Sequence, residues 1–440
     1  MGRVVVYGSC LCKGTVFCST CRNVIAVTEE QKACLELPLV SRDCDDRSLF
    51  LFHTNETFYE TADQLELAHA RGPTVLKRLQ QHCGMNYNPH GLLFDKDLRE
   101  RQILKPIDNQ IRDWMHTLVS GGVANTHIGL LLHVLDANGV SVDQVGDYSM
   151  NFTLPKKYGK VQRSWISDHR LKDATLSSFA STMLCIVPIL LCFMQEVLGP
   201  PRLAEHTLLL KLLCNIIDIL CLGADRSMAH VERLITLIDL YAKLFTKMFP
   251  GAAKPKFHQL FHVPDGMRWL GRLLSCFVTE RKHRQSKRAA LHVFRHMEHT
   301  VLSDMVNSMC ESMTNEAGNL FTKSCLIGDS GFSRNGPLSL RQSNTALLEC
   351  GIVKHEDIVY IDSGVVGRVS SFWQTEGADW FYVQVAILAP IDEGGIRYYA
   401  AESLINYFVE ASAIIDACIW IPKRNGVLKV LLPFAARVAE

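Results

Sequence analysis

The chain has 440 residues, of which 48% are hydrophobic and 21% are charged, and its formal net charge is +1. This composition is ordinary for a globular protein, and the length is enough for two or three domains with large cores. A net charge this close to zero excludes attraction of nucleic acid by the overall field, so such affinity must come from local basic patches. The two candidate patches are Lys156–Arg163 and Arg281–Arg288.

Cysteine usage and hydropathy indicate an intracellular protein. The 16 cysteines are spread over a long chain, many stand singly in apolar runs, and no signal peptide precedes them. This favours a reducing compartment over a secreted, disulfide-bonded fold. The most apolar segment, Ala180–Leu198, approaches the length of a membrane span but contains Pro188 and ends with Gln195 and Glu196. We therefore expect a buried helix there and no membrane as partner.

The first 90 residues contain one candidate for metal chemistry. Residues 3–7, RVVVY, are typical of a buried strand that starts with no lead-in, which suggests missing sequence upstream. Cys18 and Cys21 follow in the C-x2-C spacing of a zinc knuckle, which needs two more ligands. Beyond them, a helix is predicted over Glu60–His82.

The middle of the chain is predicted to be helical. Residues 106–137 favour two helices on either side of Gly121-Gly122, and residues 173–249 are helical almost throughout. Asp113 and His116 are three residues apart and therefore share a helix face. They form either a functional pair or a structural N–H···carboxylate pair.

Residues 254–288 are the most chemically dense stretch. His258 and His262 are four residues apart, so one helix face can offer both imidazoles to a metal, although ordinary helix faces also carry such pairs. Pro264 is expected to limit this helix. A carboxylate that holds a divalent metal beside cations that hold phosphate suits phosphodiester chemistry, although a solvated helix gives the same pattern. Here Glu280 is the carboxylate, and the cations are Arg281, Lys282, Arg284, Lys287 and Arg288.

The pattern changes to strand in the last quarter of the chain. Residues 326–350 are rich in Gly, Ser and Asn and are predicted to be a linker. Beyond them, short β-branched and aromatic segments separated by glycines predict a small antiparallel barrel. The predicted strands are Asp357–Ile361, Val365–Trp373, Trp380–Leu388 and Val427–Leu432.

These strands resemble small chromatin-associated barrels of the bromo-adjacent-homology, Tudor or SH3-like kind. The resemblance offers Trp373, Trp380 and Tyr382 as an aromatic cage for a methylated lysine. Packing of these rings in the core of the barrel is the alternative.

Four fragments, taken in order, resemble the CACTA-type (En/Spm-like) DNA transposases. The first is Gly8…Lys13-Gly14…Cys18-x2-Cys21, the second is Asp113-Trp114-Met115-His116, and the third is His258-x3-His262. The fourth is Gly271-Arg272-Leu273-Leu274 followed by Phe277-Val278-Thr279-Glu280-Arg281. Together they extend over residues 1–290, and the C-terminal barrel does not follow from them.

The resemblance implies an RNase H-like core that is interrupted by a helical insertion, with three carboxylates that hold two Mg²⁺ or Mn²⁺ ions. It assigns Glu280 as the third carboxylate. Through the related recombination-activating recombinases, it assigns one structural zinc ion to Cys18, Cys21, His258 and His262. The first two aspartates of the family lie upstream of the C-x2-C pair, where this sequence has no Asp. We therefore expect the chain to be inactive alone.

The sequence thus predicts an α+β protein in four parts. These are a partial RNase H-like segment in residues 1–90, a helical insertion with the rest of the core in 91–325, a linker in 326–350 and a small barrel in 351–440. The expected origin is a transposable-element DNA transposase, with DNA as partner and a nuclear location implied by the family. Two alternatives remain open: a non-catalytic DNA- or chromatin-binding protein, and an intracellular helical scaffold whose cysteines and histidines are core residues.

Overall fold

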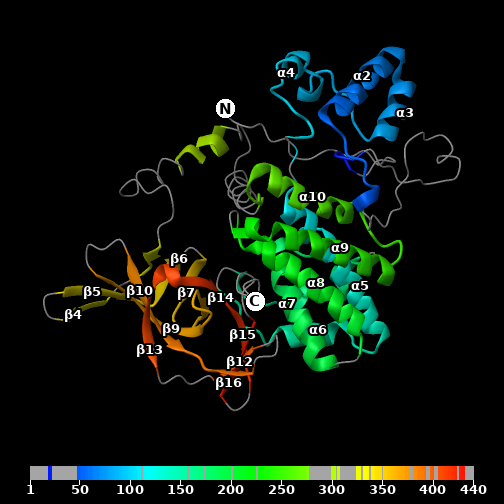
Figure 1. Cartoon of the computed structure of the whole chain (residues 1–440). Helices are drawn as coiled ribbons and strands as arrows, with labels where there is room; N and C mark the ends of the chain where they lie inside the picture. The colour runs from blue at the N-terminus through cyan, green and yellow to red at the C-terminus, as the bar shows by residue number, and fades with distance from the viewer. Residues whose placement is uncertain are drawn as a thin grey trace.

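A computed structural model describes most of the chain between Cys18 and Leu431 (Figure 1). Helices come first and antiparallel sheets follow, which confirms the α+β class. The expected strand at residues 3–7 and the stretch 277–298, with Glu280 and its cations, lie outside the described residues. The described ranges are 18–21, 47–108, 110, 112–155, 158–172, 174–199, 202–223, 226–276, 299–303, 305–307, 324–328, 331–335, 338–348, 350–375, 380–392, 397–400, 405–423 and 426–431.

The N-terminal helices form a small group at one end of the molecule (Figure 1). Thr54 begins the first of them by accepting a hydrogen bond from the backbone N–H of Thr57. The single helix that was expected over Glu60–His82 is two helices, because Gly72 turns the chain with a φ of 123° and Pro73 starts the second. The group consists of α2 (Asn55–Arg71), α3 (Pro73–Cys83) and α4 (Lys96–Glu100).

A larger helical body follows, and its apolar faces share one core in which Leu131, Leu213 and Phe245 are fully buried. The helical prediction for residues 173–249 is confirmed. Gly129 allows a helix to lie against a short hairpin, since a Cβ there would be 2.5 Å from the carbonyl oxygen of Ala174. The elements are the π-helical turn η3 (Met115–Val119), α5 (Val123–Ala137), α6 (Val142–Ser149), β1 (Leu171–Lys172), β2 (Thr175–Leu176), α7 (Ala180–Phe193), η7 (Met194–Leu198), α8 (Ala204–Cys221), α9 (Val231–Met248) and α10 (Pro255–Leu270).

Two segments of this body are long and apolar enough to cross a membrane by length and composition alone. They are Met115–Ala137 and Ala180–Leu198. Within the protein, 72% and 67% of their most apolar windows are buried. Core helices pass the same test, so the two segments are weak indications of a membrane span.

The C-terminal strands form three antiparallel sheets. The largest has the order β13-β10-β9-β5-β4, with β8 paired to β9 and β14 paired to β8. The four strands predicted after residue 350 are confirmed as β8, β9, β10 and β16. The bounds are β3 (Cys325–Leu326), β4 (Gly331–Asn335), β5 (Leu338–Ser343), β6 (Thr345–Leu348), β7 (Gly351–Lys354), β8 (Ile358–Ile361), β9 (Val366–Thr375), β10 (Phe381–Ile387), β11 (Pro390–Asp392), β12 (Arg397–Ala400), β13 (Asn406–Glu410), β14 (Ile414–Ala417), β15 (Ile419–Pro422) and β16 (Val427–Leu431).

Residues 326–350 are not a linker, because β4, β5 and β6 lie within them. The polar, Gly-rich composition suggested a loop, but β5 gains a partner that composition cannot show, since it pairs with the end of β9 between Leu340 and Ser343. Among the described strands the largest ladder does not close on itself. The barrel therefore stays a prediction. The RNase H-like core stays a prediction as well, because its expected strand at residues 3–7 lies outside the described residues.

The strands are packed directly on the helical body. Thr153 exchanges backbone hydrogen bonds of 2.7 and 3.1 Å with Trp420 in β15. Lys429 in β16 is completely buried, and its Nζ lies 2.5 Å from the Glu196 carboxylate in η7. Tyr148 completes the network, since its hydroxyl donates to Glu196 at 3.0 Å and lies 3.2 Å from the Lys429 Nζ. A buried charge with these partners fixes the register of the two parts.

Replacing this lysine tests the contact. We expect Lys429→Met to lower the free energy of unfolding by about 3 kcal/mol, because the largely buried Glu196 carboxylate loses its nearer, buried counter-charge and keeps the more distant Lys423 at 3.6 Å. Urea denaturation measures the loss, and Lys429→Met/Glu196→Gln should recover much of it. The matched control is Lys247→Met, whose exposed pair with Glu205 is worth less than about 1 kcal/mol. Equal losses from the two single variants would contradict the buried network.

Candidate metal centre

Four side chains from two distant parts of the chain meet in one buried cluster. Cys18 and Cys21 come from the short described segment before α2, and His258 and His262 project from one face of α10. All four are buried, with His262 the most exposed at 5%. One ligand atom from each residue lies within 4.8 Å of those of the other three. The structure therefore joins the two pairs that the sequence singled out separately.

The distances in this cluster suit a tetrahedral metal site. The Nε2 atom of His262 lies 3.4 Å from the Cys18 sulfur, 3.5 Å from the Cys21 sulfur and 2.9 Å from the Nε2 atom of His258. Zinc bonds of about 2.3 Å to sulfur and 2.0 Å to nitrogen require ligand atoms roughly 3.3 to 3.7 Å apart. Both sulfur–nitrogen distances from His262 fall in this range, whereas the two Nε2 atoms are closer than it and have to separate by a few tenths of an ångström to share an ion. Two thiolates and two imidazoles without a carboxylate are a donor set that can hold a metal such as zinc.

Helix α10 carries both imidazoles in the turns before Pro264, and it also continues beyond the point where it was expected to stop. Pro264 lies inside the helix, which runs on to Leu270 and ends where Gly271 adopts a φ of 71°. The expected limit at Pro264 is therefore wrong. A proline removes only one donor, and here the ring is buried in the core, so packing retains the remaining turns.

Aromatic and charged groups hold the two histidines in place. Phe50 lies against the ring of His258, with the centroids 4.2 Å apart. The Nδ1 atom of His262 faces the Asp265 carboxylate at 3.6 Å, and Arg47 forms an ion pair with the same carboxylate. A carboxylate on the far nitrogen of a metal-binding histidine fixes the ring and raises its basicity.

Arg112 provides a similar support on the cysteine side. Its guanidinium donates to the Ser19 hydroxyl at 2.6 Å and lies 3.7 Å from the Cys18 sulfur. The N–H of His53 donates to the carbonyl of Thr20 at 2.9 Å. The cysteine loop is thus held at both its backbone and its side chains.

The proton affinities within the cluster favour an anionic sulfur. Burial opposes ionisation of Cys18, but hydrogen bonding with Cys21 and the charge of His262 hold the pKa of Cys18 well below its usual value. Hydrogen bonding to Cys18, followed by burial, raises the pKa of Cys21. Burial lowers the pKa of His258. For His262 burial acts against protonation, but the Cys18 charge and Asp265 raise its pKa. A metal ion would take the place of these protons.

The Asp113 and His116 pair is present, and it makes one contact that the sequence did not indicate. Asp113 Oδ2 accepts from the backbone N–H of His116 at 3.0 Å and lies 2.6 Å from its Nδ1. Asp113 Oδ1 accepts from the backbone N–H of Cys276 at 2.8 Å. The N–H···carboxylate contact is therefore present, and it is compatible with either role of the pair. Asp113 thereby holds the backbone at Cys276, four residues before Glu280. Glu280 itself lies outside the described residues, as do Arg281, Lys282, Arg284, Lys287 and Arg288.

Two of the three candidate cage residues lie on neighbouring strands, and the third, Trp380, immediately precedes β10. Tyr382 in β10 is paired directly with Trp373 in β9, and the ring of Trp380 meets that of Tyr382 edge-on at 5.1 Å. Trp380 is 55% exposed. The Trp373 indole donates to the Ser371 hydroxyl at 2.7 Å. Along β10, Tyr382 alternates with the core residue Phe381 and faces away from the core.

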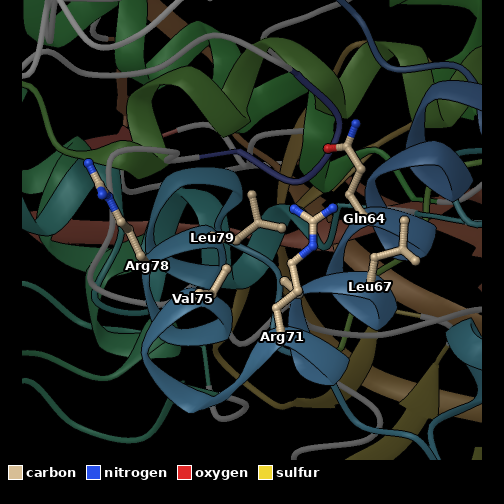
Figure 2. Close-up of a pocket in the computed structure, with 7 residues that line it drawn as sticks. Gln64, Leu67, Arg71, Val75, Arg78 and Leu79 are labelled. Carbon is tan, nitrogen blue, oxygen red and sulfur yellow. The ribbon is translucent and has the colours of Figure 1, made fainter.

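Sequence reasoning missed a groove of about 400 Å³ between α2 and α3 (Figure 2). Its lining includes the exposed Leu67 and Val75, and the Arg71 side chain extends between Leu79 and Gln64 (Figure 2). No thiol, imidazole or carboxylate lines it, so it offers a surface for binding and no groups for acid–base or metal chemistry. The lining residues are Gln64, Leu67, Ala68, Arg71, Val75, Arg78 and Leu79.

Comparison of the chain with protein-family models, with curated proteins and with solved structures finds no match. The cluster must therefore be interpreted from its own geometry and chemistry.

The Asp265 carboxylate gives a test of the metal site that leaves all four ligands in place. We expect Asp265→Asn to weaken zinc binding by roughly 10- to 100-fold, because the amide cannot hold and polarise the His262 ring as a carboxylate does. Competition with a chromogenic zinc chelator measures the affinity. The control is Glu232→Gln, which breaks the exposed ion pair between Glu232 in α9 and Arg268 in α10. This variant should bind zinc as the parent does. An unchanged affinity for Asp265→Asn would contradict the assigned support.

Proposed function

We propose that this chain is a zinc-containing DNA-binding protein descended from a CACTA-type DNA transposase. The observation that carries the proposal is the meeting of Cys18 and Cys21 with His258 and His262 in one buried cluster. In the resemblance, these four residues share one structural zinc ion. A shared ion requires the four side chains to lie close together, and they do. This proximity supports the assignment because the two pairs come from short motifs that are far apart in the sequence.

The cluster also bears on the alternative of a helical scaffold. If these cysteines and histidines were ordinary core residues, nothing would require the two sulfurs to lie near the two imidazoles. A separation above roughly 10 Å would have excluded a shared ion. The observed 3.4 and 3.5 Å separations from His262 favour a metal site instead.

The proposed contact with DNA is the cationic segment that follows Cys276 in sequence. Asp113 holds the backbone of Cys276, and Glu280 and the cations of residues 281–288 come next in the chain. Closely spaced Arg and Lys residues bind phosphates and release counterions from DNA. DNA cleavage is not part of the proposal, because it needs three carboxylates on Mg²⁺ or Mn²⁺ and the resemblance assigns only Glu280 here.

A chromatin ligand is the second candidate function, and the exposed Trp380 favours it. Trp380 and Tyr382 form an aromatic corner on the outer face of the largest sheet, and Glu410 in β13 lies directly opposite Tyr382. Aromatic faces beside a carboxylate attract quaternary and methylated ammonium groups. Binding of a trimethyl-lysine peptide that is lost in Trp380→Ala would support this candidate.

Charge reversal tests the proposed DNA contact. We expect the parent chain to bind duplex DNA with a steep salt dependence, and Arg281→Glu/Arg284→Glu/Lys287→Glu to reduce the slope of log K against log salt by about 3, since each lost phosphate contact contributes roughly 0.9. Fluorescence anisotropy at several salt concentrations measures both quantities.

The matched control changes the net charge equally at three exposed sites of the helical body. It is Arg226→Glu/Lys211→Glu/Lys243→Glu. This variant should keep the parent slope. Equal losses in both triple variants would show a general charge effect, and binding that does not respond to salt would contradict the proposal.

A further inference from the structure

A second group of potential metal ligands lies outside the buried cluster. Asp113 lies just before η3, His116 is in the first turn of η3, and Cys276 is in the segment that follows α10. One oxygen, one nitrogen and one sulfur atom from these residues lie within 4.8 Å of one another. None of the three belongs to the Cys18, Cys21, His258 and His262 site.

These side chains are already held in position before any ion binds. Asp113 Oδ2 accepts a hydrogen bond from the backbone N–H of His116 and lies within hydrogen-bond distance of its Nδ1. Asp113 Oδ1 accepts from the backbone N–H of Cys276. The Asp113 side chain is only 9% exposed, so it has little freedom to turn away. A preorganised donor set lowers the entropic cost of binding an ion.

The group differs from the buried cluster in its access to solvent. The His116 side chain is 46% exposed, whereas every ligand of the first site is buried. A site with three protein ligands and an open side leaves a fourth position for water or for an oxygen of another molecule. A mixed O, N and S donor set selects borderline-soft divalent ions such as zinc or cobalt over magnesium.

We propose that Asp113, His116 and Cys276 form a second, solvent-open site for a divalent ion of the zinc class. On binding, the ion displaces the proton of the Cys276 thiol, which passes to solvent, while the neutral His116 ring binds through a nitrogen that carries no proton. This site depends neither on DNA binding nor on the transposase resemblance.

The second site should be the weaker of the two. The Nζ atom of Lys256 donates to the carbonyls of His116 at 2.7 Å and of Ser120 at 3.0 Å, which places a positive charge beside the ion. Repulsion between like charges reduces the affinity for the ion. Added metal should therefore fill the buried Cys18, Cys21, His258 and His262 site first and the Asp113, His116 and Cys276 site second.

The test uses the full chain with the first site filled by one equivalent of zinc, followed by titration with cobalt. We expect one further equivalent to bind with a sulfur-to-cobalt charge-transfer band. Cys276→Ser should abolish that band, and His116→Gln should weaken cobalt binding roughly tenfold or more. Cys325→Ser, at an exposed cysteine elsewhere, is the control and should behave as the parent.

Retention of the first zinc equivalent reports that each variant is folded. His116→Gln changes a half-exposed side chain, so it keeps the test decisive if Cys276→Ser does not fold. Absence of a second equivalent in the parent would overturn the proposal. A second equivalent with the same band and affinity in His116→Gln and Cys276→Ser would also overturn it, because the ion would then lie elsewhere.

Discussion

The protein depends on one interaction between parts of the chain that are distant in sequence. The Cys18 sulfur and the His262 ring are 3.4 Å apart although 244 residues separate them. A metal ion at this point would close a very long loop, and its binding free energy would add directly to the free energy of folding. The same ion would satisfy thiols and imidazoles that would otherwise be costly to bury. The position of the cysteine loop on α10 follows from this contact.

Two adjacent residues extend the influence of the cluster. Arg112 supports the Cys18 side of the site, and Asp113 holds the backbone of Cys276, where the chain leaves the end of α10. Because Arg112 and Asp113 are adjacent in the chain, they connect the cysteine loop to Cys276, where the segment that carries Glu280 begins. A structural ion at a distance can in this way fix residues that it does not touch.

Much of the architecture could be predicted from the sequence, because helical periodicity and the four later strands are local patterns. The two halves of the metal cluster could also be identified from the C-x2-C spacing and from the i, i+4 histidines. Other features depended on tertiary partners. Strand β5 needs β9 beside it, α10 continues through Pro264 because its neighbours bury it, and the Lys429–Glu196 pair joins two parts that no local pattern connects. The contact of Asp113 with the Cys276 N–H is a backbone interaction, for which side-chain spacing gives no signal.

The most direct measurement is X-ray absorption at the zinc edge of the protein carrying one equivalent of zinc. Two sulfur neighbours at about 2.3 Å and two nitrogen neighbours at about 2.0 Å are expected for Cys18, Cys21, His258 and His262. His258→Ala/His262→Ala should lose this signature. A shell of oxygen and nitrogen alone, or a two-sulfur shell that persists in the double variant, would contradict a shared ion as the centre of this structure.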